Sequence, residues 1–125
     1  MVRIKNPTAE QSKKRMSVRV PLAMIARIEE NLLASGYNKK ERYFWFEDIL
    51  NELFTGPDYH NLIAEEFITA GTTKVVTLSI SIETYRKIES TVAEVFDIEN
   101  YNTDKSSVIR TAIIQRLLKS NRQLL

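Results

Sequence analysis

The chain has 125 residues, of which 43% are hydrophobic and 27% are charged, with only 3 glycines and 3 prolines. This size and composition indicate one globular domain and argue against disorder, collagen-like repeats and proline-rich spacers. Cysteine is absent and histidine occurs once, which excludes disulfides and thiolate zinc sites and argues against catalytic triads. There is no phosphate-binding loop, and no pair of carboxylates has the surrounding residues of a catalytic site. We therefore expect no enzymatic activity, no metal and no cofactor.

Charge is distributed unevenly along the chain. The net charge is +6 over residues 1–45, −6 over residues 46–72 and +2 over residues 73–125. A concentrated basic region on a nearly neutral chain suits local contact with a polyanion, although a solvated basic tail is the simpler alternative. No apolar run approaches the roughly 20 residues that cross a bilayer, and the N-terminus lacks the apolar core of a secretory signal. We expect a cytoplasmic protein with no membrane contact and no small-molecule substrate.

At the N-terminus, residues 1–12 are polar and aperiodic, which predicts a flexible basic arm. Residues 15–20 alternate apolar and polar side chains, which predicts a half-buried strand that ends at Pro21. An amphipathic helix of about four turns follows. Its apolar stripe consists of Met24, Ile25, Ile28, Leu32 and Leu33.

A second helix is predicted from Asn38 to about Phe54, because Asn38 and Glu41 have the spacing of a capping box. Its aromatic run, residues 43–46, is interpreted mainly as core, with part of it available for a protein interface. A short third helix is predicted over residues 58–69. The acidic side chains of this region are interpreted as a solvated face turned away from any polyanion; they are Glu47, Asp48, Glu52, Asp58, Glu65 and Glu66.

The opening pattern then returns. Residues 75–80 alternate as a second strand, and Ser81 can cap the helix that follows it. The apolar stripe of that helix consists of Tyr85, Ile88, Val92, Val95 and Phe96. Asp104 can cap a last helix, whose inward residues are Val108, Ile109, Ala112, Ile113 and Leu117.

The chain therefore contains an internal repeat of strand, helix and helix. The shift that superposes the first strand on the second takes Arg15 to Val75 and Val20 to Ile80, and we call it the repeat offset. A lone strand leaves its backbone groups unpaired, so we expect the two strands to pair with each other in an antiparallel ribbon.

Alternation gives this ribbon two faces of different chemistry. It puts Met16, Val18, Val20, Val76, Leu78 and Ile80 on the inner face, against the helices. It puts Arg15, Ser17, Arg19, Val75, Thr77 and Ser79 on the opposite side, which we call the outer face.

These residues resemble the ribbon-helix-helix family of Arc/MetJ-like DNA-binding proteins. In the first half, the likeness lies in the segment from Arg15 to Pro21 and in the apolar stripe of the helix that follows. In the second half, it lies in residues 76–81 and 105–110. Most members of that family carry one copy of the motif and dimerise, so two copies in one chain resemble tandem members such as TraY-type plasmid transfer proteins and mobile-element regulators.

The resemblance implies a mostly α fold with a short two-stranded antiparallel β-ribbon, in which two ribbon-helix-helix units form an intramolecular pseudo-dimer. The expected segments are a basic arm (1–12), a first unit (13–56), a linker helix (57–72) and a second unit (73–125), with one core shared by the two units. The second strand lacks arginine, so we expect an asymmetric DNA half-site.

The resemblance also implies two sets of contacts with double-stranded DNA. The outer face would read base edges in the major groove, which admits a two-stranded ribbon. Phosphates would be held at the start of each second helix and beside the first strand. The expected phosphate-binding residues are Lys13, Lys14, Asn38, Lys39, Lys40, Lys105 and Ser106.

The function expected from this resemblance is sequence-specific DNA binding by a transcriptional regulator, most simply a repressor, of a mobile element, plasmid or virus. One alternative is a relaxosome accessory protein that binds an origin of transfer. A further alternative is an antitoxin-type interaction module, but the chain ends close to the last helix, which argues against it. Self-association of pseudo-dimers along DNA is an additional expectation.

Overall fold

The computed structural model describes residues 13–66 and 71–124, with side chains described as far as Lys119. The predicted arm, residues 1–12, lies outside the described residues. So do residues 67–70, which include the end of the predicted linker helix.

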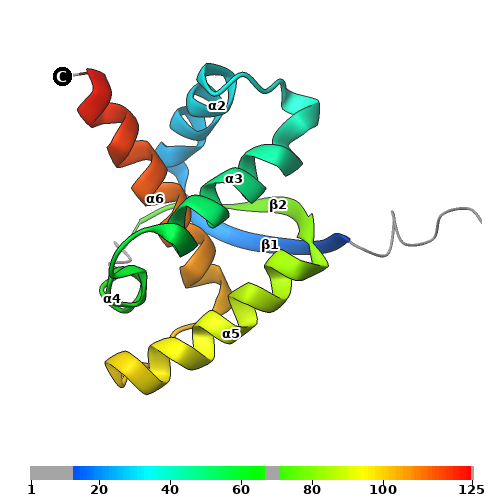
Figure 1. The fold of residues 1–125 in the computed structure, drawn as a ribbon. Coiled ribbons are helices and arrows are strands. Elements are labelled where there is room, and N and C mark those ends of the chain that lie inside the picture. Colours follow the sequence, from blue (N-terminus) through cyan, green and yellow to red (C-terminus); the bar gives the residue numbers. More distant parts are fainter. Residues whose placement is uncertain (1–12, 67–70, 125) are drawn as a thin grey trace, which may run out of the picture.

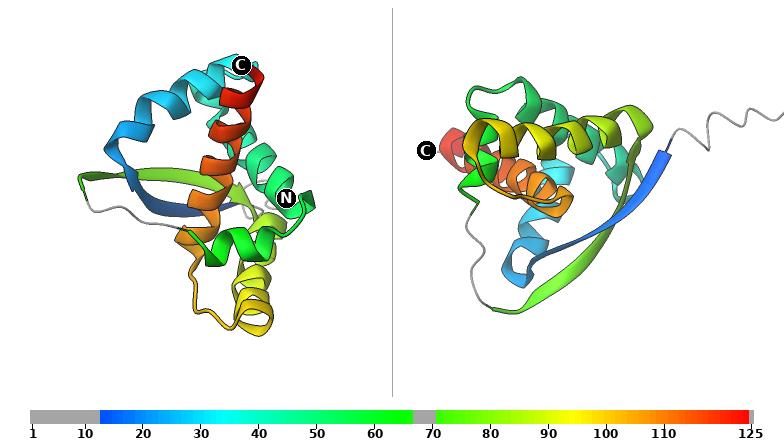
Figure 2. Two further views of the ribbon diagram at one scale, coloured as in Figure 1. Left: turned by 90° about the vertical axis from the view of Figure 1, so that its left-hand side faces the viewer. Right: turned by 90° about the horizontal axis from the view of Figure 1, so that it is seen from below.

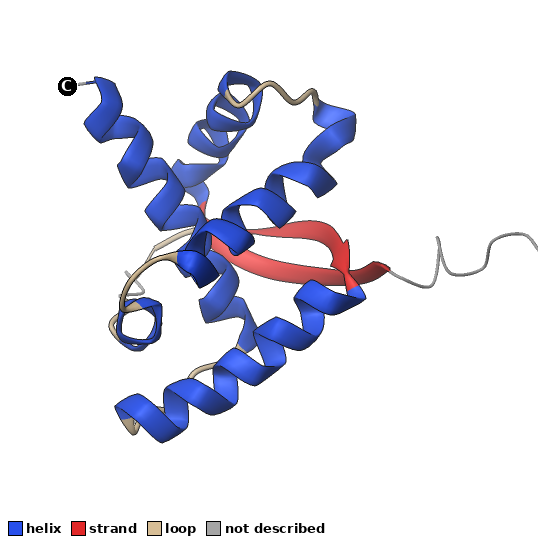
Figure 3. Cartoon of the chain, viewed as in Figure 1, coloured by secondary structure: helices blue, strands red, loops and turns tan. Residues whose placement is uncertain are grey.

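Two strands, β1 (Lys13–Pro21) and β2 (Thr73–Ser81), pair antiparallel as a two-stranded sheet, which we call the ribbon (Figures 1 and 3). Each strand begins two residues earlier and ends one residue later than the sequence pattern predicts. Pro21 is the last residue of β1, where the missing N–H costs the ladder little. In the register, the middle residue of β1, Ser17, lies opposite the middle residue of β2, Thr77. The prediction of a mostly helical chain with one antiparallel strand pair is confirmed.

Each strand is followed by two longer helices. The elements after β1 are η1 (Leu22–Met24), α2 (Ile25–Ala34), η2 (Lys39–Glu41) and α3 (Arg42–Thr55), where η denotes a 3-10 helix. The elements after β2 are α5 (Ile82–Glu99) and α6 (Lys105–Leu124), and α4 (Tyr59–Ala64) lies between the two halves. None of the helices in the described ranges is long and apolar enough to cross a membrane.

The caps predicted from the sequence form in the structure. Asn38 Oδ1 accepts from the backbone N–H of Lys40 at 2.9 Å, and the backbone N–H of Asn38 donates to Glu41 Oε1 at 3.0 Å. This capping box opens η2, which continues into α3. Ser81 Oγ caps α5, and Asp104 Oδ1 caps the start of α6. These contacts fix where each helix begins relative to the ribbon.

The core lies between the ribbon and the helices, which cover one side of it (Figure 2). On the inner face of the ribbon, Val18, Val20, Val76, Leu78 and Ile80 are buried and Met16 is half-buried. All five inward residues predicted for the last helix are buried, as are Trp45 and Phe46. Tyr43 is half-buried and Phe44 is exposed, so the aromatic run divides between core and surface.

Two residues predicted as core are on the surface. Leu33 is 56% exposed and Phe96 is 50% exposed. Some polar residues of the same helices are buried. Asn31 is buried and accepts a hydrogen bond from Trp45 Nε1 at 2.9 Å, and Thr84 and Thr91 are buried in α5.

The interpretation of the acidic segment as a solvated face is wrong for Glu47, Glu52 and Glu66, which are half-buried, whereas Asp48, Asp58 and Glu65 are exposed. Glu47 accepts from the backbone N–H of Ser81 at 2.6 Å, and Glu52 pairs with Arg116 and Lys119. Asp48 accepts from the Tyr37 hydroxyl. Glu66, with a side chain only 5% exposed, pairs with Arg110 at 2.5 Å. Each of these carboxylates either pairs with a cation or accepts a hydrogen bond from another part of the chain.

Candidate nucleic-acid interface

The outer face of the ribbon presents three cross-strand pairs. Arg15 lies opposite Ser79, Ser17 opposite Thr77, and Arg19 opposite Val75. Ser79 is half-buried and the other five side chains are exposed. All six residues predicted to read bases are therefore brought together on one surface. Ser17 and Thr77 occupy the centre of this face, and the two arginines flank them.

The chemistry of this face differs between the strands. β1 contributes two guanidinium groups, whereas β2 contributes two hydroxyls and the apolar Val75, which is 46% exposed. Arg19 Nη1 donates to Thr73 Oγ1 at 3.3 Å, an exposed contact. Arginine can donate twice to one guanine edge, hydroxyls can donate or accept, and valine can contact a thymine methyl. The face is therefore cationic on one strand and neutral on the other.

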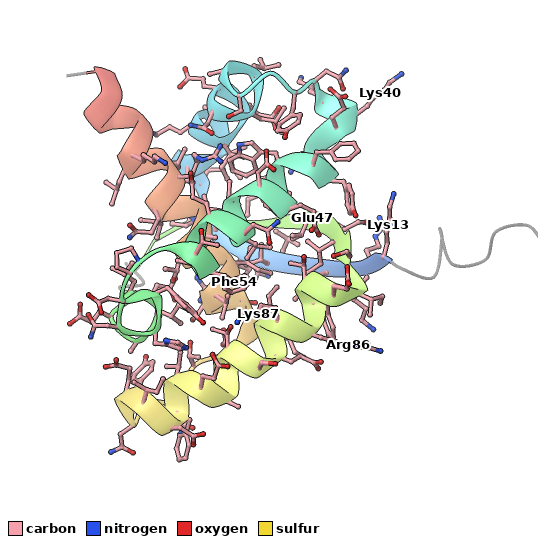
Figure 4. All side chains as sticks on the ribbon, in the orientation of Figure 1. Lys13, Lys40, Glu47, Phe54, Arg86 and Lys87 are labelled. Atoms are coloured by element: carbon pink, nitrogen blue, oxygen red, sulfur yellow. The ribbon has the colours of Figure 1, made fainter. Side chains whose placement is uncertain are left out.

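Two polar contacts join the ribbon to the helices, one made by a guanidinium group and one by a carboxylate. In α6, Arg110 Nη1 donates to the backbone oxygen of Arg19 at 3.3 Å, and the guanidinium also pairs with Glu66. In α3, Glu47 accepts from Ser81 N–H and from Thr84 Oγ1 at 2.8 Å, which joins α3 to the end of β2 and the start of α5. Figure 4 labels Glu47 beside this junction. Both ends of the reading surface therefore rest on fixed supports.

Two lysines and a tyrosine gather at one flank of the ribbon. Lys14 Nζ and Lys105 Nζ each lie 5.2 Å from the centre of the Tyr85 ring. Lys105 Nζ also lies 3.9 Å from Glu89 Oε2. A hydrogen bond with Tyr85 raises the pKa of Lys105 above its usual value. The two cations come from different elements and share one aromatic support.

The other predicted phosphate-binding residues divide into two groups. Lys13, Lys39 and Lys40 are exposed, and Lys13 Nζ lies 4.5 Å from the Tyr43 ring centre. In Figure 4, Lys13 and Lys40 project toward the same side of the molecule. The side chain of Asn38 is used in the capping box, and Ser106 is half-buried. The lysines thus supply the accessible charge at this end, and Asn38 supplies the cap.

Comparison of the chain with protein-family models, curated proteins and solved structures gave no match.

Two cations near the ribbon are absent from the predicted site. Arg42 and Lys74 line one pocket of about 250 Å³, together with Ile25, Glu29 and the outer-face residues Val75 and Thr77. The repeat offset takes Lys14 to Lys74, so alignment of the repeat with itself provides a sequence signal for Lys74. Arg42 has no such signal, because its approach to the ribbon depends on how α3 packs.

The single histidine has a structural partner. His60 Nε2 lies 2.7 Å from Glu94 Oε1, which joins α4 to α5, and the His60 side chain is 20% exposed. Among the described residues, no group of three His, Asp or Glu side chains is placed to hold a metal ion.

Proposed function

We propose that this chain is a sequence-specific, double-stranded DNA-binding protein that inserts its ribbon into the major groove. The observation that carries the proposal is the outer face: six side chains that can contact base edges lie in three registered pairs on one side of a ribbon whose other side is buried. A two-stranded ribbon fits the width of the major groove. Groups aimed at bases must be held in place, and the Arg110 and Glu47 anchors supply that support.

The tandem ribbon-helix-helix interpretation is supported by the register. Ser17 and Thr77 are paired in the ribbon, and the repeat offset takes one to the other. Each central residue is therefore paired with its own counterpart. A symmetric dimer of single-copy chains would pair its central residues in the same way, with a two-fold axis between them. We therefore interpret the chain as an intramolecular pseudo-dimer with a pseudo-two-fold axis between Ser17 and Thr77.

The difference between the strands favours an asymmetric target. The two-fold axis would place Arg15 and Arg19 in positions equivalent to Val75 and Ser79. A homodimer repeats its side chains on both strands, whereas this chain presents guanidinium groups on one strand alone. We propose that the half of the site read by β1 is rich in guanine, and that the half read by β2 is specified by weaker hydroxyl and methyl contacts.

Positive charge on β1 and at the starts of the second helices supports contact with phosphates. Lys13, Lys14, Lys39, Lys40 and Lys105 would neutralise backbone charge and fix the register of the protein on the duplex. A protein that occupies a defined site in this way regulates transcription most simply by blocking access to it, so we propose a repressor-type regulator.

Selection from random duplex DNA, followed by footprinting of the enriched sequence, tests the proposal. We expect one enriched sequence with a compact footprint, guanine-rich on one side and without two-fold symmetry. A protein that enriches no sequence, or one that enriches a perfect palindrome, would contradict the proposal of an asymmetric reading ribbon.

A further inference from the structure

A pocket beside β2 contains two cations that form no part of the outer face. Arg42 is the first residue of α3 and Lys74 is the second residue of β2, and both line the pocket of about 250 Å³. Val75 and Thr77, which belong to the outer face, line the same pocket. An anion bound there would therefore lie directly beside the base-reading surface.

The repeat relates this pocket to the Lys14–Lys105 flank. The repeat offset takes Lys14 to Lys74, and it takes Ile25, which lines the pocket, to Tyr85, which supports the lysines of the other flank. Arg42 follows the turn η2 in the helical segment that Asn38 caps, and Lys105 directly follows Asp104, which caps α6. Each flank thus combines one strand lysine with one cation near the start of the second long helix of its half.

Matching ion pairs support the same relation. Arg42 Nη1 lies 3.6 Å from Glu29 Oε2, and Lys105 Nζ lies 3.9 Å from Glu89 Oε2. The repeat offset also takes Glu29 to Glu89. Both contacts are long for ion pairs, and the four side chains are 29–48% exposed. Exposed pairs of this kind are weak, so either cation can turn toward a stronger anion.

We propose that Arg42 and Lys74 bind a DNA backbone phosphate, as the counterpart of a phosphate held by Lys14 and Lys105 on the other side of the ribbon. This inference rests on the proposed DNA binding. The two phosphates belong to opposite DNA strands, because the pseudo-two-fold axis that relates the flanks also relates the strands of the duplex. The chain therefore clamps the backbone nearly symmetrically while it reads the bases asymmetrically.

Glu29 makes the proposal specific. Its Oε1 atom is buried with no hydrogen-bond partner, and its Oε2 atom is the one that holds Arg42. A phosphate in the pocket must compete with this carboxylate. Glu29→Gln removes the competing charge and should raise DNA affinity roughly two- to fivefold at low salt, the range of a weak exposed ion pair. A purely structural role for Glu29 predicts no gain.

The salt dependence of binding to a mixed-sequence duplex, followed by fluorescence anisotropy, tests the site. Each lost phosphate contact should reduce the slope of log affinity against log salt by about 0.9. We expect this reduction for Lys74→Ala and for Lys14→Ala. Lys119→Ala is the matched control, since it removes one exposed lysine that pairs with Glu52 near the far end of α6, and it should leave the slope unchanged.

The outcomes separate the two proposals. If the unmodified protein binds no duplex at any salt concentration, the proposed function fails. If it binds and Lys14→Ala lowers the slope, but Lys74→Ala behaves like Lys119→Ala and Glu29→Gln gives no gain, the second phosphate site is overturned and DNA binding stands. Lys74 is exposed, so its replacement leaves the fold intact, and thermal melting followed by circular dichroism checks this.

Discussion

Removal of Glu66 should destabilise the whole domain. Its side chain is 5% exposed and makes two hydrogen bonds with Arg110, from Nε at 2.5 Å and from Nη2 at 3.3 Å. The Arg110 side chain is 12% exposed. Glu66→Ala would leave this largely desolvated guanidinium without a counter-charge, with hydrogen bonds only to the Arg19 backbone oxygen and Ser107 Oγ, which costs about 3–5 kcal/mol. That is a large fraction of the roughly 5–15 kcal/mol by which a domain of this size is stable.

Urea denaturation followed by tryptophan fluorescence measures the loss. The chain has one tryptophan, Trp45, which is fully buried and so reports global unfolding. The midpoint should fall and the slope with urea should stay unchanged. Replacement of both partners, as in Glu66→Leu with Arg110→Met, should recover much of the lost stability because no buried charge is then left. A cost below about 1 kcal/mol for Glu66→Ala would show that the pair contributes no more than an exposed one, contrary to its burial.

Three further predictions concern the core, the oligomeric state and the response to acid. Val18→Asp places an unpaired charge in the core and should abolish the circular dichroism melt; a cooperative melt near that of the parent would contradict the burial of this ribbon face. Light scattering at low concentration should find a folded monomer, and a dimer that unfolds on dilution would mean that the strands pair between chains. The hydrogen bond from His60 holds the pKa of Glu94 below its ordinary value of 4.5, so this contact stabilises the fold above that pH and is lost as the pH falls through the lowered pKa. Urea midpoints in acid should therefore fall less steeply for Glu94→Gln than for the parent, and equal slopes would contradict the assignment.

Features that depend on neighbouring residues could be predicted from the sequence. Alternation identified both strands and both faces of the ribbon, because side chains alternate along any strand. The caps at Asn38, Ser81 and Asp104 were predicted because a cap needs a side chain and a backbone N–H only two or three residues apart. The six outer-face residues follow from these two local rules.

Contacts between distant residues could not be predicted in this way. Glu66 and Arg110 are 44 residues apart, and Glu47 and Ser81 are 34 apart, so no local pattern distinguishes these carboxylates from solvated ones. The burial of Asn31 likewise depends on Trp45, whose indole N–H needs an acceptor inside the core. The periodicity of α5 gives Phe96 the same stripe as the buried Ile88 and Val95, yet Phe96 is 50% exposed, because burial depends on which neighbouring elements reach each position.

The contribution of Arg19 to base reading decides whether the ribbon recognises sequence. It is measured by binding titrations of the parent and Arg19→Ala proteins on the selected duplex and on a scrambled duplex of the same length and composition. Arg19 is exposed on the outer face, and its backbone is fixed by Arg110. The substitution should cost about 1–3 kcal/mol on the selected duplex and relax the preference at one base pair, with little change on the scrambled one. Lys40→Ala, as a phosphate contact, should weaken both duplexes by similar factors. An equal loss on both duplexes for Arg19→Ala, or no loss on either, would contradict the proposal that the ribbon reads sequence.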